Sequence, residues 1–171
     1  KVVDLSSINT ATYPGLRIAM RTTDTENRST YQLKYWSVYG TPVPEGAVAP
    51  NLYYNKIDSI EVGEPLNLGV AFKNISNKAF DSINVKLIIR NKNNVESIIL
   101  VPKLKALIPG DTVKLNIPVN TQAFAGTNLA YVEFNPEGSQ YQAEQHQYNN
   151  FIFQNFHVRG DTISPQLDVT Y

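Results

Sequence analysis

The sequence of 171 residues contains no cysteine. This absence excludes disulfide bonds, thiolate metal sites and a cysteine nucleophile within these residues, although it leaves the cellular compartment open. Methionine and tryptophan each occur once, whereas there are ten tyrosines and seven phenylalanines. Aromatic residues favour strands, so the composition already leans toward a β protein.

Charge of either sign is scarce and evenly balanced, with fifteen basic and fifteen acidic residues and no run of one sign. A protein that grips nucleic acid or an anionic membrane needs a concentrated basic face, so we expect neither partner. No stretch approaches the roughly eighteen apolar residues of a membrane helix, and we expect no membrane insertion. The chain begins at Lys1 without a signal-type apolar segment, so we expect it to be part of a longer protein.

Period-two alternation of apolar and polar residues is the main structural signal. It runs through residues 66–72, 83–89, 113–119 and 130–134, and each apolar set has to be covered by a second sheet. The Asn-rich turn 91–94 joins residues 83–90 and 95–102 into a predicted hairpin. Helical periodicity is not evident. The predicted core consists of Leu68, Val70, Val85, Leu87, Leu115, Ile117 and Val132.

These signals predict an all-β chain, an antiparallel immunoglobulin-like β-sandwich with extra flanking strands. We expect the sandwich over residues 48–160. Residues 1–47 contain strand-like pieces, Leu16 to Arg21 and Tyr31 to Tyr39, and read as the end of a preceding β module or as strands packed on the central domain. Residues 161–171 read as the start of the following module.

The order of signals from Pro50 to Val158 resembles the CARDB family of bacterial adhesion-related, immunoglobulin-like domains. The resemblance lies in several short pieces taken together, and no piece alone is specific. They are Pro50-Asn51-Leu52, Gly63-Glu64, Val70 to Ser76, Leu107 to Val113, Val132 to Glu137 and Tyr148-Asn149-Asn150. The resemblance implies a non-catalytic module that adheres or spaces.

The flanking segments resemble those around such domains in large surface proteins that Gram-negative bacteria export by the type IX route, some of which carry gingipain-like cysteine peptidase domains. The segments that match are Tyr13 to Arg17, Gln32 to Tyr39, Pro42 to Ala47 and Pro165 to Tyr171. This resemblance implies an extracellular or cell-surface parent. Its partners would be neighbouring domains of the same chain, other surface proteins or glycans.

Candidate catalytic groups are few. Nucleophilic catalysis needs a nucleophile, a base and a group that orients the base. The chain has two histidines, and we interpret His146 as a loop residue and His157 as a solvent-facing strand residue. We therefore expect no enzyme activity and no cofactor.

Two binding patterns have structural alternatives. Asn135, Glu137, Glu144, Asn149 and Asn150 form an oxygen-rich loop that could hold calcium. The favoured alternative is that Asn149 and Asn150 bond to backbone at the start of a strand. A second set could form a sugar-stacking platform, but packing in a core or at a junction between modules is favoured for it: Tyr35, Trp36, Tyr39, Tyr53 and Tyr54.

Four segments read Asp-Ser/Thr-aliphatic, and they begin at Asp58, Asp81, Asp111 and Asp161. This pattern resembles the acceptor motif for protein O-glycosylation in the same bacterial group, although Asp beside a turn is also ordinary turn-to-strand chemistry. The candidate acceptors are Ser59, Ser82, Thr112 and Thr162. The leading hypothesis for the chain is a non-catalytic surface module, and the alternative is an accessory domain that positions a gingipain-like peptidase.

Overall fold

The computed structural model describes residues 3–9, 11–21, 23, 25–26 and 33–160, and its contacts divide the chain into two units, residues 1–40 and 41–171. The described residues of the first unit form turns and extended backbone without any strand. The described residues of the strand-like pieces Leu16 to Arg21 and Tyr31 to Tyr39 therefore form no strand. These pieces alternate in the sequence, but among the described residues no strand pairs with them.

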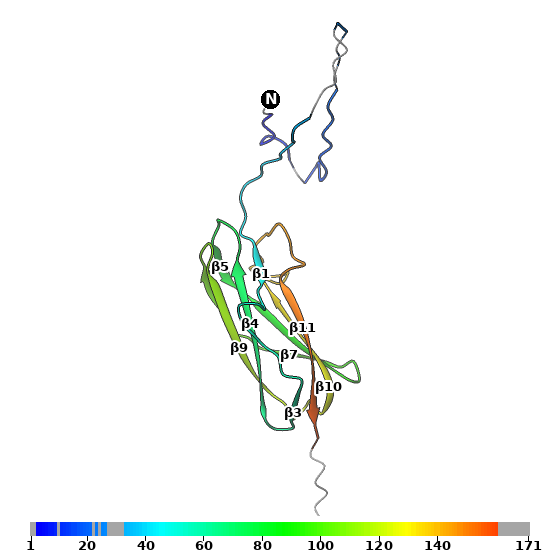
Figure 1. Ribbon diagram of the computed structural model, residues 1–171, viewed down its shortest axis with the longest axis vertical. Coiled ribbons are helices and arrows are strands. Elements are labelled where there is room, and N and C mark those ends of the chain that lie inside the picture. The colour runs from blue at the N-terminus through cyan, green and yellow to red at the C-terminus, as the bar shows by residue number, and fades with distance from the viewer. Residues whose placement is uncertain (1–2, 10, 22, 24, 27–32, 161–171) are drawn as a thin grey trace, which may run out of the picture. The chain divides into compact units, whose positions relative to one another are not determined.

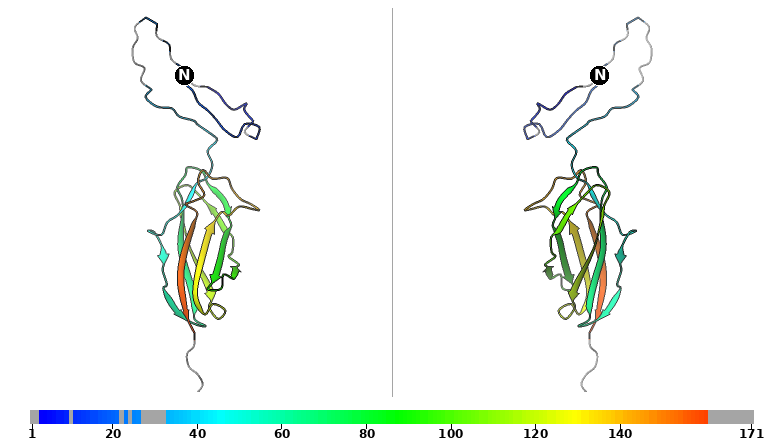
Figure 2. Two further views of the ribbon diagram at one scale, coloured as in Figure 1. Left: turned by 90° about the vertical axis from the view of Figure 1, so that its right-hand side faces the viewer. Right: turned by 90° about the vertical axis from the view of Figure 1, so that its left-hand side faces the viewer.

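The second unit is built from two facing sheets and a small third one (Figures 1 and 2). The first sheet contains β1 (Gly46–Val48), β2 (Tyr54–Asn55), β4 (Pro65–Asn74) and β9 (Thr112–Asn120). The second has the order β3 (Ser59–Glu61), β11 (Phe151–Arg159), β10 (Gly126–Phe134), β6 (Val85–Asn91) and β7 (Glu96–Ile99). The third pairs β5 (Phe80–Ile83) with β8 (Leu104–Leu107).

All strand pairs are antiparallel except β3 and β11, which run parallel. The predicted all-β sandwich is confirmed. No helix in the described part of the chain is long and apolar enough to cross a membrane.

The core lies between the two larger sheets. Phe72 of β4 stacks on Phe134 of β10, with ring centroids 4.5 Å apart and planes inclined by 8°. Five of the seven predicted core residues are buried, whereas Val85 and Leu115 are half-buried at its margin. Leu115 lies in β9, at the edge of its sheet, and Val85 is the first residue of β6, so neighbouring strands cover each of them less completely.

The predicted hairpin forms between β6 and β7, where Asn94 adopts the left-handed conformation with φ of 61°. The alternating run 83–89 is not one strand, however. It is divided at Asn84, so that Ile83 pairs within β5 and β8 while Val85 begins β6 beside β10. The Asn84 carbonyl accepts a hydrogen bond from the Asn135 backbone N–H at 2.9 Å, which fixes the point where the chain changes sheets.

The chain enters and leaves the sandwich at opposite ends. Gly46 pairs with Asn74, the last residue of β4. Arg159, the last residue of β11, pairs with Glu61, just before β4 begins at Pro65. Since a strand rises about 3.3 Å per residue, the ten residues of β4 separate the two ends by about 30 Å.

Candidate functional site

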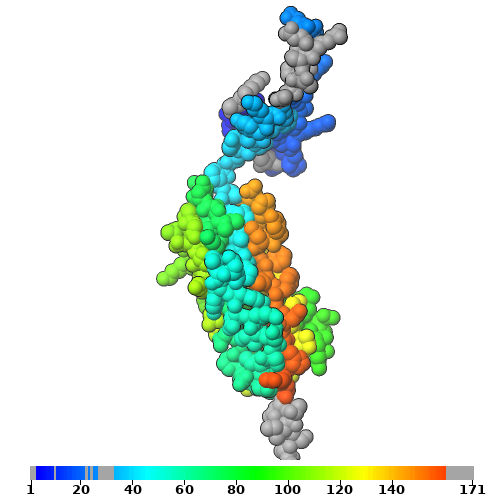
Figure 3. All heavy atoms as spheres, viewed as in Figure 1, coloured from blue at the N-terminus to red at the C-terminus, as the bar shows by residue number. Residues whose placement is uncertain are grey.

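Two glutamates join the start of the sandwich to the loop between β10 and β11. We call this group, Glu45, Glu144, Asn135, Asn149 and Asn150, the carboxylate clasp. In the space-filling view the cyan start of the sandwich lies directly beside the orange loop that carries Glu144 (Figure 3). The backbone reinforces this contact, because Val48 N–H donates to the Asn149 carbonyl at 2.8 Å.

Glu144 accepts three hydrogen bonds with its side chain. Its Oε2 accepts the backbone N–H of Gly46 at 2.8 Å. Its Oε1 accepts the amide groups of Asn135 at 2.6 Å and Asn150 at 2.5 Å. Burial raises the pKa of the Glu144 carboxyl and the nearby charge of Glu45 adds to this, whereas the three hydrogen bonds act in the opposite direction.

Glu45 is buried and makes the matching set of contacts. Its Oε2 accepts the backbone N–H groups of Gln145 at 2.7 Å and His146 at 3.0 Å. Its Oε1 accepts the Asn149 side-chain amide at 3.2 Å. All four carboxylate oxygens of the clasp therefore have N–H partners, as buried charges require. The clasp ties the segment before β1 to a loop about one hundred residues further along the chain.

The structure changes our interpretation of the two asparagines that precede β11. Their backbone carbonyls do bond to neighbouring strands, at Val48 and Phe134. Their side chains, however, donate to Glu45 and Glu144 rather than to backbone. The Oδ1 atoms of Asn149 and Asn150 are buried without a hydrogen-bond partner. Glu137, the other predicted calcium ligand with a charge, is exposed and outside these contacts.

Both histidines lie in the predicted places, with exposed side chains. His146 belongs to the loop, where its ring lies 5.3 Å from that of Tyr148. His157 points outward from β11 with Nδ1 3.3 Å from the Thr127 hydroxyl. Among the described contacts, no nucleophile, base and orienting carboxylate come together around either ring.

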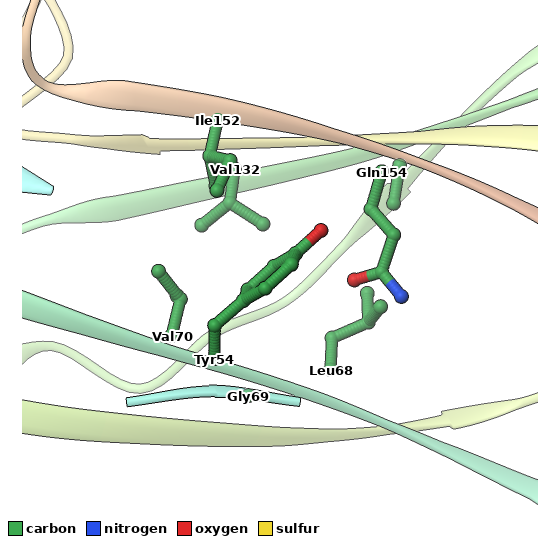
Figure 4. A pocket seen from close by; sticks show the side chains of 8 residues that line it. Tyr54, Leu68, Gly69, Val70, Val132, Ile152 and Gln154 are labelled. Atoms are coloured by element: carbon green, nitrogen blue, oxygen red, sulfur yellow. The ribbon is translucent and has the colours of Figure 1, made fainter. Parts of the chain in front are cut away.

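The predicted aromatic set does not gather into one surface. Tyr35, Trp36 and Tyr39 are exposed in the first unit, so the expected core or junction packing is not seen for them within that unit. In the sandwich, Tyr54 inserts its ring between Val132, Leu68 and Gln154 (Figure 4). The cavity beside this ring measures about 10 Å³, which is room for one water molecule at most.

The candidate glycan acceptors differ in exposure. Ser59 is exposed on β3, while Ser82 on β5 and Thr112 on β9 are half-buried. Ile83, beside Ser82, is fully buried as predicted, whereas Val113, beside Thr112, is only partly buried against the core. Thr162 lies outside the described residues.

A cluster of aromatic residues that the sequence analysis did not predict lies on the outer face of the five-stranded sheet. Tyr131, Phe151 and Phe153 form it, with centroid distances of 5.0 to 5.7 Å. The signal was present, because Phe151 and Phe153 alternate with Ile152 and Gln154. Because β11 has apolar residues on both faces, the sequence pattern does not show which of the two alternating sets points outward.

Comparisons with known proteins find matches among solved structures. No family model and no curated protein matches the chain. Among solved structures, a CARDB domain from Pyrococcus furiosus, in complex with di-metal ions, is 17% identical, with a TM-score of 0.54 over 80% of this chain and 99% of that one. The solution structure of the same domain gives 17% identity and 0.54 over 70% and 98%.

A β-glucosidase from Listeria innocua is 16% identical, with a TM-score of 0.50 over 84% of this chain and 21% of that one. The likeness to it therefore concerns a small part of that enzyme. At such identities these likenesses show a shared fold. The chain is a β-sandwich whose structural neighbours include CARDB domains.

Proposed function

We propose that the chain is a non-catalytic extracellular module, a spacer or adhesion domain of a large exported bacterial surface protein. The observation that carries the proposal is the structural likeness to a CARDB domain, of which the match covers 99%. The clasp supports it, since its two carboxylates are occupied by N–H donors and hold the fold together. Neighbouring domains of the same parent are the expected partners, along with other surface proteins or glycans.

The path of the chain suits a spacer. Because Gly46 and Arg159 lie at opposite ends of β4, the module adds about 30 Å to the distance between its neighbours. Backbone hydrogen bonds hold both ends of the module to the sandwich, at the carbonyl groups of Glu45 and Arg159. Such an end-to-end path suits a module that holds a neighbouring domain away from the cell envelope.

The metal ions of the Pyrococcus domain raise the question of a cation here. Calcium takes about 6–8 oxygen ligands, and the described residues contain no group of three His, Cys, Asp or Glu side chains that could hold a metal. In the clasp every carboxylate oxygen faces an N–H group. These residues do not fit a divalent cation, and the module is proposed to act without one.

The alternative role is that of an accessory domain that positions a gingipain-like cysteine peptidase of a type IX-exported parent. It rests on the resemblance of four flanking segments, Tyr13 to Arg17, Gln32 to Tyr39, Pro42 to Ala47 and Pro165 to Tyr171. Deleting residues 41–160 from the parent gene separates the two roles. The leading proposal predicts weaker attachment of the cells with the parent's other activities unchanged. Loss of a peptidase activity with normal attachment would favour the accessory role.

Glycosylation is proposed for the same export route. Ser59 is the best placed acceptor, because its side chain is exposed. Ser82 and Thr112 are half-buried, so a transferase would reach them less easily. Peptide mapping of protein from the native host tests Ser59, Ser82, Thr112 and Thr162 together. An added mass on Ser59 supports the proposal, and unmodified peptides at all four positions contradict it.

A further inference from the structure

The outer face of the five-stranded sheet carries an apolar band where a solvent-facing sheet usually has polar side chains. The strand register places Phe153, Tyr131, Ile88 and Ile98 in one row across β11, β10, β6 and β7. In the left view of Figure 2 the strands β11, β10 and β6 lie side by side. Phe153 is 53% exposed and Ile98 is 76% exposed, so nothing in the described chain covers this row.

The band contains a hollow of about 320 Å³. Its lining combines four apolar or aromatic residues with one ion pair, and consists of Ile88, Leu129, Tyr131, Phe153, Arg90 and Glu96. This volume is at the lower end of the range of small-molecule sites, about 300–1,000 Å³. The cavity beside Tyr54 is far smaller, and the hollow is the larger of the two cavities described.

The ion pair gives the hollow both hydrogen-bond donors and acceptors. Arg90 donates from Nε to Glu96 Oε1 at 3.1 Å and contacts the same oxygen through Nη2. A guanidinium has five N–H donors and a carboxylate two acceptor oxygens, so the pair keeps further bonding capacity. The charges of the pair cancel, and the hollow therefore favours a neutral ligand over an ionic one.

The aromatic side chains of the lining contact one another and the neighbouring Phe151. The Tyr131 ring lies 5.0 Å from Phe153 and 5.7 Å from Phe151, at tilts of 38° and 43°. Burial raises the pKa of Tyr131 to about 12, and the charge of Glu133 adds to this. A hydrogen bond between the Tyr131 hydroxyl and the Glu133 side chain raises the pKa further, so this hydroxyl already has a partner.

We infer that this hollow binds a neutral carbohydrate, a mono- or disaccharide unit of pyranose rings. A pyranose presents an apolar C–H face that stacks on Tyr131 and Phe153, and hydroxyls around its edge that meet the Arg90–Glu96 pair. This amphipathic pattern matches the lining better than a protein surface would, because the hollow contains a half-exposed ion pair at its side. The inference names a ligand class for the adhesion role proposed above.

Titration of the full chain with cellobiose, lactose and N,N′-diacetylchitobiose tests the inference, with two-dimensional NMR of the backbone amides as the readout. At least one sugar should shift the resonances of Leu129, Tyr131 and Phe153. Phe153→Ala should weaken its binding about tenfold. Glu96→Gln, which keeps the shape of the hollow, should weaken it as well. The matched control Ile108→Ala, at an exposed residue outside the lining of the hollow, should leave it unchanged.

Three outcomes overturn the inference. One is the absence of shifts with every sugar at concentrations of roughly ten times a millimolar dissociation constant. Another is a shift pattern outside the hollow that Phe153→Ala does not alter. The third is concentration-dependent association of the sugar-free chain that Phe153→Ala abolishes, which would show that a second copy covers the face. None of these three outcomes tests whether the protein is exported to the cell surface, which a separate experiment addresses.

Discussion

Glu144 and Gly46 lie 98 residues apart in the sequence, yet the Glu144 carboxylate accepts the Gly46 backbone N–H at 2.8 Å. This bond joins the first strand of the sandwich to the loop before the last one. Because Glu45 makes the reciprocal contacts to Gln145 and His146, the two glutamates close the end of the module at which the chain enters.

Removal of the Glu144 carboxylate should destabilise the module. Glu144→Ala leaves the N–H groups of Gly46, Asn135 and Asn150 without their acceptor, and a buried unpaired donor costs about 1–3 kcal/mol. We expect urea unfolding to show a loss of this size. Glu137→Ala, an exposed glutamate of the same loop, is the control and should change stability by less than about 0.5 kcal/mol. Equal effects of the two variants would contradict the clasp.

The raised pKa of Glu144 predicts a pH dependence. Above pH 4.5, the ordinary pKa of a glutamate, the folded protein binds the proton of the Glu144 carboxyl more tightly than the unfolded chain does. The stability that Glu144 contributes is therefore complete below that pH and falls as the pH rises through the raised value. Glu144→Gln removes the titration, so the free energy of unfolding of the wild type minus that of the variant should decrease as the pH rises above 4.5. An increase would refute the sign of the shift.

Gly46 is required because β1 lies directly against the core. A Cβ at this position would lie 2.1 Å from Cζ of Phe72, whose ring is fully buried and stacked on Phe134. Gly46→Ala should therefore cost about 1–3 kcal/mol through overpacking. Thermal unfolding compares it with Gly160→Ala, where a Cβ meets no atom within 4 Å. If both variants unfold at the wild-type temperature, β1 does not pack as described.

Leu87 tests the core itself. Its side chain has 0% exposure, and its Cα pairs with that of Val132 across β6 and β10. Leu87→Ala should lower the free energy of unfolding by about 2–5 kcal/mol. Leu100, which is 94% exposed, provides the matched control. A Leu87→Ala variant as stable as Leu100→Ala would mean that the two sheets do not pack through this residue.

The sequence predicted the sandwich because alternation is a local signal. In β4 and β10 it identified Leu68, Val70 and Val132 as core residues, since the alternating residues of one face are apolar over 66–72 and 130–134. It missed the division at Asn84, because the alternation continues through the point where the chain changes sheets. A change of partner strand leaves the period unaltered.

The polar contacts between distant parts of the chain could not be predicted from the sequence, for a different reason. Asn135, Glu144 and Asn150 were recognised as an oxygen-rich group, but Glu45 lies about a hundred residues away and no local pattern links it to them. Without Glu45, the loop resembled a cation site. With it, the hydrogen-bond donors of the asparagines and of the backbone account for every carboxylate oxygen.

The most direct test of the central claim, a non-catalytic module displayed at the cell surface, is antibody labelling of unpermeabilised cells of the native host. Antibodies raised against the full chain should label intact cells, and brief protease treatment of those cells should remove the label. A deletion strain lacking residues 41–160 provides the control for specificity. Labelling that occurs only after the cells are permeabilised would contradict the account.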